Sequence, residues 1–266
     1  MNIKLLDEYI LEDIQNPEHP SEFIVVNDKC MLILRLPELD EENNLQIISY
    51  AFVLQNEECY LYNREKNDFD RLGSLEDMNH FLDEKIENLI KEIKEYYIEI
   101  DHLEDTLYES SRNDNFMSKW LTYKKELSLV HRLIFHATLS FDLFIKYNKK
   151  FSSFEELAYA DLHEHMERIR DLSKAALDKL DHLYDFYRAK VDEKMNKNIY
   201  YLTVLSGVFL PLTLVSGFFG MNTGGLPFTE DTDGTLKVVL ISLILEIMVF
   251  LPFIYNAMKK IKRFKR

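Results

Sequence analysis

Residues 199–222 read IYYLTVLSGVFLPLTLVSGFFGMN, and this stretch decides the fold class of the whole chain. Residues 199–219 contain no charged side chain, and about 20 apolar residues in a helix suffice to cross a bilayer core. A second apolar run, 238–258, carries one acid, Glu246. The sequence therefore predicts a transmembrane domain of two helices, joined by a polar outer loop at 220–237.

The chain ends in a basic tail, 259–266, which reads KKIKRFKR. Because positively charged residues stay on the cytoplasmic side of a membrane, this tail predicts a cytoplasmic C-terminus. Two spans then return the long N-terminal part of the chain to the same side. We expect a multi-pass protein of the cell inner membrane, with both termini in the cytoplasm.

Composition narrows the classes of function. The chain has 46 acidic against 32 basic side chains, a formal charge of −14, although its tail is basic. An acidic domain repels nucleic acid and attracts cations, so no nucleic-acid partner is expected. Cys30 and Cys59 lack the spacing of a metal or redox motif. We find no nucleophile–base pair, phosphate loop or HExxH motif, so we expect neither an enzyme nor an organic cofactor.

Residues 1–72 are predicted to form a small α/β head. The segment Ile3–Ile14 has the apolar spacing of a helix. Four short runs rich in β-branched and aromatic residues follow, and polar residues break them, as is typical of strands. These runs are Phe23–Val26, Cys30–Leu36, Gln46–Leu54 and Cys59–Tyr62.

Residues 73–198 are predicted to form a long helical hairpin and a stalk helix. Apolar residues at helical spacing over 75–109, and again over 115–147, predict two helices of similar length. The stretch that follows has no helix breaker before Gly207. A helix from about 154 to 219 is roughly 100 Å long at about 1.5 Å per residue, which suits a stalk that continues into a membrane.

The end of the first span resembles a known family. Pro211-Leu-Thr213 precedes Gly220-Met-Asn222, and the tripeptide stands at the outer end of the first of two C-terminal spans. In this setting the motif resembles the CorA family of divalent metal cation transporters. The resemblance implies a funnel-shaped homopentamer with an α+β cytoplasmic domain, in which the first span of each subunit lines a central pore.

The resemblance covers about residues 75–266, whereas the head is shorter than the α/β domain usual in the family. Gly224-Gly-Leu-Pro227 is similar to the zinc-transporting ZntB branch, while the acidic loop resembles the magnesium branch. The transported ion is therefore open between Mg²⁺ and Zn²⁺. The remaining matching segments are Ile98–Glu104, Asp161–His165, Tyr184–Tyr187 and Met195–Asn196, and the loop acids are Glu230, Asp231 and Asp233.

One face of the first span changes from apolar to polar or small toward its outer end. Steps of three and four residues place six side chains on one stripe, and the resemblance implies that five copies of it line the pore. Its aliphatic members can form a dewetted gate, although an apolar stripe also suits ordinary helix packing. The stripe consists of Ile199, Leu202, Ser206, Leu210, Thr213 and Gly217.

Asn222 is the candidate selectivity residue, with Gly220 and Met221 completing the motif. A ring of Asn222 carboxamide oxygens can accept hydrogen bonds from the water shell of an ion. This arrangement suits Mg²⁺, because Mg²⁺ gives up its waters reluctantly. The alternative interpretation is a helix C-cap, since Asn tolerates left-handed backbone geometry.

Acidic residues on the stalk are candidate metal ligands. The resemblance implies that Asp161, with Glu164 beside it, contributes to a regulatory metal site between subunits, and that Asp185 concentrates cations at the cytoplasmic pore entrance. A solvated charged helix face is the alternative. Glu246 departs from the family pattern, and an acid within a membrane span is a functional candidate by default. It either couples transport to protons or is protonated and bonded to a neighbouring helix.

We therefore expect a homo-oligomer in a lipid bilayer that carries Mg²⁺, and also Co²⁺ or Ni²⁺. Entry of a divalent ion into a negative-inside cell releases about 4.6 kcal/mol per 100 mV, so uptake needs no ATP. Two alternatives stay open. One is ZntB-like transport of Zn²⁺ coupled to protons, and the other is a two-span membrane sensor or scaffold that moves no ion.

Overall fold

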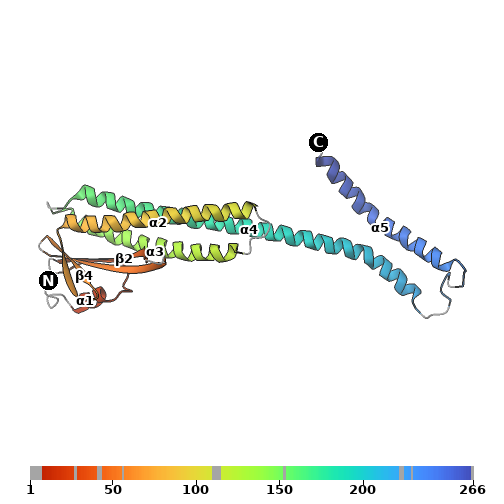
Figure 1. The fold of residues 1–266 in the computed structure, drawn as a ribbon, viewed down its shortest axis with the longest axis horizontal. Helices are drawn as coiled ribbons and strands as arrows, with labels where there is room; N and C mark the ends of the chain where they lie inside the picture. Colours follow the sequence, from red (N-terminus) through yellow and green to blue (C-terminus); the bar gives the residue numbers. More distant parts are fainter. Residues whose placement is uncertain are drawn as a thin grey trace. The chain divides into compact units, whose positions relative to one another are not determined.

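The chain consists of two compact units, Met1–Tyr187 and Arg188–Arg266. The N-terminal unit contains a five-stranded sheet with helices on both of its faces, and the C-terminal unit contains the end of one long helix and the last helix (Figure 1). The computed structural model describes residues 8–26, 29–40, 44–55, 57–109, 115–151, 154–221, 225–228 and 230–264.

The elements of the N-terminal unit follow the sequence prediction with one addition. They are α1 (Glu8–Gln15), β1 (Glu22–Val26), β2 (Lys29–Leu39), β3 (Leu45–Gln55), β4 (Glu58–Asn63), β5 (Asp68–Gly73), α2 (Leu75–Glu109), α3 (Phe116–Asn148) and the first part of α4 (Glu156–Phe219). The C-terminal unit holds the rest of α4 and α5 (Gly234–Phe264).

The sheet is an antiparallel meander in which each strand pairs with the next along the chain, in the order β1-β2-β3-β4-β5. The four predicted strand runs are confirmed as β1 to β4. β5 was not predicted, because its sequence DFDRLG is mostly polar and only Phe69 in it is buried. The predicted first helix is confirmed from Glu8 onward, and residues 1–7 lie outside the described residues.

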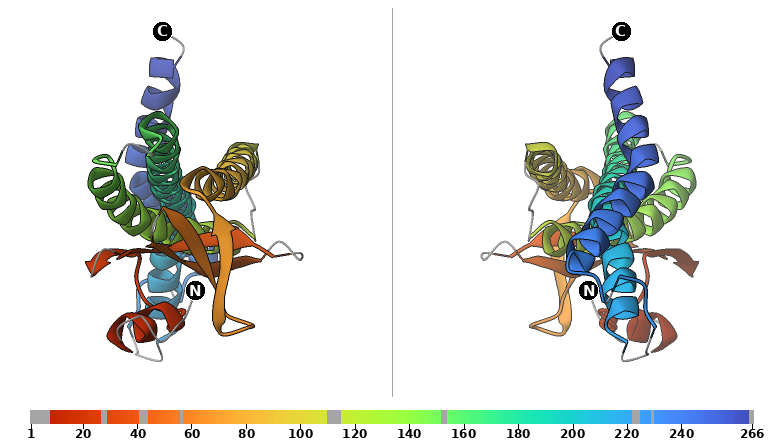
Figure 2. Two further views of the ribbon diagram at one scale, coloured as in Figure 1. Left: turned by 90° about the vertical axis from the view of Figure 1, so that its left-hand side faces the viewer. Right: turned by 90° about the vertical axis from the view of Figure 1, so that its right-hand side faces the viewer.

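Both faces of the sheet are buried, because successive side chains of a strand point to opposite sides. Alternate residues of β2 pack with α2, α3 and α4 on one face, and the residues between them pack with Ile14 of α1 on the other. Figure 2 shows α1 on the opposite side of the sheet from α2 and α3. The first set is Cys30, Leu32, Leu34 and Leu36, and the second is Met31 and Ile33. The sheet and the long helices therefore share one core.

The predicted helices over 75–109, 115–147 and about 154–219 are confirmed as α2, α3 and α4; the bounds of α2 agree, and those of α3 and α4 differ by one or two residues. Polar side chains fix the three helices to one another. The Tyr97 hydroxyl on α2 donates to the Leu172 carbonyl on α4 at 2.9 Å. The Trp120 indole N–H on α3 donates to the Leu180 carbonyl, also on α4, at 2.9 Å.

Within the described residues, α3 and α4 are long and apolar enough to cross a membrane, judged by length and composition. In α3, 44% of the apolar stretch is buried, because this helix packs against the sheet and is a core helix. In α4, none of the apolar stretch is buried. The second predicted span, 238–258, lies in α5, whose side chains at 249 and 252–264 are outside the described part.

Candidate functional site

The stripe predicted on the first span lies on an uncovered face of α4. All six of its residues are exposed within the chain. Leu202 is 64% exposed and Leu210 is 69% exposed. A contiguous row of exposed large aliphatic side chains marks a contact surface for lipid or for another protein chain.

The opposite face of α4 is half-buried. A Cβ atom built on Gly207 would lie 3.7 Å from the ring of Phe250, so this face turns toward α5. At about 100° per residue, the half-buried set and the stripe fall on opposite sides of the helix. The half-buried residues are Val204, Gly207, Val208, Pro211, Leu212, Val215 and Phe219.

Polar groups inside the apolar stretch of α4 are partly satisfied by the helix itself. Pro211 lies within the helix without ending it, and it has no N–H to donate to the Gly207 carbonyl one turn earlier. The Thr213 hydroxyl donates to the Phe209 carbonyl at 2.7 Å. Its oxygen keeps lone pairs on the stripe, where they can accept a further hydrogen bond.

The Gly-Met-Asn motif begins where α4 ends. The helix stops at Phe219, and the Gly220 N–H donates to the Ser216 carbonyl at 2.9 Å. A Cβ on Gly220 would lie 3.0 Å from that carbonyl oxygen, so the turn has little room for a side chain. Met221 is exposed. Asn222, the predicted selectivity residue, lies outside the described residues.

The loop before α5 is organised by charge and by one glycine. Lys237 forms an ion pair with Asp231 at 2.6 Å and lies over the ring of Phe228, 5.6 Å from its centroid. A Cβ on Gly234 would come within 1.8 Å of the Phe228 carbonyl oxygen, so only glycine fits there. One of the three loop acids is thus paired, while Glu230 and Asp233 are exposed.

The predicted stalk ligands do not form one site within the chain. Asp161, Glu164 and Asp185 are all exposed on α4. Asp161 and Asp185 are separated by about 36 Å along the helix at about 1.5 Å per residue. They cannot bind the same ion in one chain, whereas Asp161 and Glu164 lie one turn apart on the same face.

The two histidines beside Asp161 are engaged in contacts within the chain. The ring of His163 lies nearly parallel to that of Phe141, with centroids 6.5 Å apart and an interplanar angle of 12°. The Nδ1 atom of His165 lies 3.8 Å from a carboxylate oxygen of Asp83 on α2.

Glu246 lies on α5 and is half-buried.

The structure also assembles a group that the sequence analysis missed. Asp13, His19 and Glu22 bring one carboxylate, one imidazole and a second carboxylate together beside α1 and β1. The residue types and the short spacing were visible in the sequence. Neither helical nor strand periodicity predicts that these three side chains meet, however, because the end of a helix and a turn lie between them in the sequence.

Comparison with known proteins extends the resemblance to nearly the whole chain. A family model described as "CorA-like Mg2+ transporter protein" matches residues 3–260. The zinc transport protein ZntB of Vibrio parahaemolyticus is 28% identical over 151 residues, which are 57% of this chain and 47% of the relative. The divalent cation transporter CmaX of Pseudomonas aeruginosa is 20% identical over 156 residues, 58% of this chain and 46% of the relative.

A third relative, the cobalt/magnesium transport protein CorA of Thermotoga maritima, is 32% identical over 69 residues, 26% of this chain and 20% of the relative. The matched segments of the ZntB and CmaX relatives thus span about half of their length. These relatives are named for different ions: zinc, divalent cations in general, and cobalt or magnesium. Sequence similarity therefore does not identify the ion that this chain transports.

Solved structures share the fold. The complete CorA magnesium transporter from Methanocaldococcus jannaschii gives a TM-score of 0.74 at 18% identity, covering 93% of this chain and 82% of that one. The full-length CmaX structure gives 0.70 at 16% identity, covering 97% and 83%. The α/β head and long helices of these structures match the fold class predicted from the sequence. Because the family match runs from residue 3 to residue 260, the chain belongs to the family of CorA-like Mg²⁺ transporter proteins.

Proposed function

We propose that this protein is an inner-membrane transporter of divalent cations in which several copies of α4 enclose the ion path. The family consists of transporters rather than enzymes. The observation that carries the proposal is the exposed stripe of α4, opposite the face that turns toward α5. A face left uncovered by its own chain is available to line a pore between copies.

The number of copies is proposed to be five, with both ends of the chain in the cytoplasm. The basic tail supports this orientation, since its charges hold the C-terminus on the cytoplasmic side. Two crossings, by α4 and α5, then leave the loop at 220–237 outside. Glu230 and Asp233, exposed in that loop, would attract cations to the outer mouth.

Ion selection is assigned to Asn222 at the outer end of α4. A ring of carboxamides holds a hydrated ion by hydrogen bonds to its water, and binds it weakly enough for it to leave. Thr213 offers a second polar ring further inside. Ile199, Leu202 and Leu210 form the gate, because closely spaced aliphatic rings expel water from a narrow pore.

Regulation is assigned to acids on the part of α4 before the membrane. Asp161 and Glu164 are exposed and lie one turn apart, so a metal bound there would take its remaining ligands from another subunit. Loss of that metal would leave acids of neighbouring subunits to repel one another. Asp185, further along the helix, would concentrate cations near the cytoplasmic pore entrance.

Mg²⁺ is the first candidate for the transported ion, because uncharged amide and hydroxyl oxygens suit a cation that keeps its water shell. Zn²⁺ transport coupled to protons is the second candidate. It is favoured by Gly224-Gly-Leu-Pro227, by Glu246 within α5 and by the similarity to ZntB.

The deciding experiment is ion flux into liposomes that contain the purified protein. Mg²⁺, Zn²⁺, Co²⁺ and Ni²⁺ are each tested with and without a proton gradient, alongside Asn222→Ala. We expect Mg²⁺ flux without a gradient and a loss of about tenfold or more in the variant. A monomeric protein that passes no divalent ion would contradict the proposal and would favour a sensor or scaffold.

A further inference from the structure

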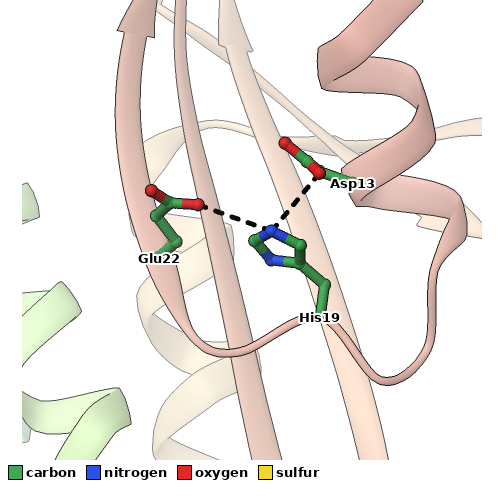
Figure 3. A group of neighbouring side chains, drawn as sticks. All are labelled: Asp13, His19 and Glu22. Atoms are coloured by element: carbon green, nitrogen blue, oxygen red, sulfur yellow. Dashed lines mark ion pairs between the residues drawn. The ribbon is translucent and has the colours of Figure 1, made fainter.

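Three potential metal ligands converge at one edge of the sheet, far along the sequence from the proposed pore. Asp13 lies on α1, His19 on the turn that follows, and Glu22 at the start of the edge strand β1 (Figure 3). One ligand atom from each residue lies within 4.8 Å of the other two. The three residues are partly buried, and the His19 side chain is only 16% exposed.

The orientation of the His19 ring leaves one nitrogen free for a metal. Its Nδ1 atom lies 2.9 Å from the carbonyl oxygen of Pro20. A carbonyl oxygen only accepts hydrogen bonds, so Nδ1 carries the proton and donates it. In the neutral ring, Nε2 then holds a lone pair, and Nε2 is the atom that faces both carboxylates (Figure 3). Histidines that bind metals are commonly oriented by such a bond to a backbone carbonyl.

The distances within the group also suit a bound ion. Nε2 lies 3.3 Å from an oxygen of Asp13 and 3.6 Å from an oxygen of Glu22. A charge-assisted hydrogen bond between an imidazolium and a carboxylate is shorter, at about 2.7–2.9 Å. Two ligands bound to zinc at about 2.0–2.1 Å and at tetrahedral angles lie about 3.3 Å apart. The Nε2–Asp13 distance matches that spacing, and the Nε2–Glu22 distance is 0.3 Å longer.

The backbone between the three ligands is held in place by two arginines. The Arg64 guanidinium donates to the Gln15 carbonyl at 2.7 Å, and the Arg35 guanidinium donates to the Glu18 carbonyl at 3.1 Å. Both arginines bind backbone oxygens in these contacts, so these bonds position the turn and leave the carboxylate oxygens of Asp13 and Glu22 available to other partners. The two carboxylates supply two negative charges, which match one divalent cation.

We propose that Asp13, His19 and Glu22 bind Zn²⁺, with water completing a four-coordinate site. Zinc accepts both imidazole nitrogen and carboxylate oxygen, and open zinc sites commonly have three protein ligands. Mg²⁺ favours all-oxygen ligands in octahedral geometry, so the imidazole disfavours it. The bound ion would fasten α1 to the edge of the sheet, where Ile14 is buried.

Zinc counting on the full-length protein in detergent tests the site. The protein is stripped with EDTA, dialysed against Zn²⁺, and its bound zinc is measured per chain by mass spectrometry. The variants are His19→Gln and the nearly isosteric pair Asp13→Asn with Glu22→Gln. His136→Gln is the matched control, since His136 is exposed on α3 and its described ring contact is with Phe135.

We expect both site variants to bind one Zn²⁺ per chain fewer than the wild type, and the control to bind as many as the wild type. Mg²⁺ in large excess should not displace this zinc. Equal zinc counts in the wild type and a folded site variant would overturn the proposal, and size-exclusion chromatography establishes which variants are folded. Displacement by Mg²⁺ would overturn the assignment to zinc. Neither result depends on ion flux, so the proposed transport is judged separately.

Discussion

Gly207 of α4 faces the ring of Phe250 in α5, and a Cβ atom at residue 207 would lie 3.7 Å from that ring. This distance is an ordinary van der Waals contact, so the two helices pack closely here without excluding a methyl group. The contact turns one face of α4 toward α5 and leaves the stripe on the other side of the helix. The half-buried face of α4 therefore turns toward α5, and the stripe proposed to line the pore lies on the opposite face.

A graded substitution at Gly207 tests this packing. Gly207→Ala should keep the fold and the flux, because the added methyl group meets Phe250 at a normal distance and alanine favours a helix by about 1 kcal/mol. Gly207→Leu should overpack the contact at a cost of about 1–3 kcal/mol. The thermal unfolding midpoint of the protein in detergent is the measurement. Equal midpoints for the two variants would contradict the contact.

Cysteine labelling tests the stripe directly. Thr213→Cys places a thiol on the stripe, and Val215→Cys places one on the half-buried face two residues away. If the stripe lines the proposed water-filled path, a charged, water-soluble thiol reagent should react with the first and block ion flux by about tenfold or more. The reagent should leave flux in the second variant unchanged.

The two native cysteines should not react with the thiol reagent in this experiment. Cys30 and Cys59 are both buried in the N-terminal unit. Burial raises the pKa of the Cys30 thiol to about 11 and that of the Cys59 thiol to about 12, so neither forms the reactive thiolate near neutral pH. Similar block of both engineered variants would mean that the stripe does not define the path.

Much of the fold could be predicted because its signals are local. A stretch without charge predicted the end of α4, and apolar runs predicted β1 to β4. β5 was missed because its polar sequence forms a strand only through pairing with β4. Pairing of this kind depends on tertiary structure, which a single-sequence pattern does not contain.

The candidate sites were predictable to different degrees. The stripe follows from helical periodicity, so its members could be named from the sequence. The ligands around His19 could not, because a turn set by Arg35 and Arg64 brings Asp13 and Glu22 to the ring. Those arginines come from β2 and from the turn after β4, so the site exists only in the folded unit.

Tyr159 allows the contribution of one buried hydrogen bond to the stability of the N-terminal unit to be measured. Its side chain is fully buried, and its hydroxyl donates to the Leu75 carbonyl at 2.8 Å, joining α4 to the start of α2. Tyr159→Phe removes that hydroxyl alone and should lower stability by about 1 kcal/mol. This corresponds to a fall of about 2–4 °C in the unfolding midpoint. Tyr9→Phe, at a residue that is 78% exposed, should change nothing.

Glu92 of α2 should make stability depend on pH. Burial raises its pKa to about 7, the Leu39 N–H opposes that rise, and the charges of Glu38 and Glu95 add to it. In the unfolded chain the carboxyl ionises near its usual pKa of about 4.3. Between these values the folded protein holds the extra proton, so stability falls as pH rises from about 4.5 to 7.

Glu92→Gln should remove that slope and stabilise the protein at pH 8 by about 2 kcal/mol. Unfolding midpoints measured from pH 4.5 to pH 8 give the comparison. Glu87→Gln is the matched control, because Glu87 is exposed on the same helix and does not contribute to the raised pKa of Glu92. If the wild type and Glu92→Gln have parallel pH profiles, the Glu92 carboxyl has the same pKa in the folded protein as in the unfolded chain.

Glu246 separates the two candidate transport mechanisms. It is half-buried on α5, within the second predicted span, where an acid is costly unless it is protonated, paired or used in transport. Glu246→Gln keeps the size and hydrogen-bonding groups of the side chain while removing its capacity to exchange a proton.

If Mg²⁺ moves as a hydrated ion without coupling, flux in liposomes should have the same dependence on the proton gradient in the variant as in the wild type. If protons drive Zn²⁺ transport through this residue, the wild type should need the gradient and the variant should lose its response to it. A gradient-dependent wild type with an equally dependent variant would exclude Glu246 as the coupling residue and leave its hydrogen bonding within the helices as its role.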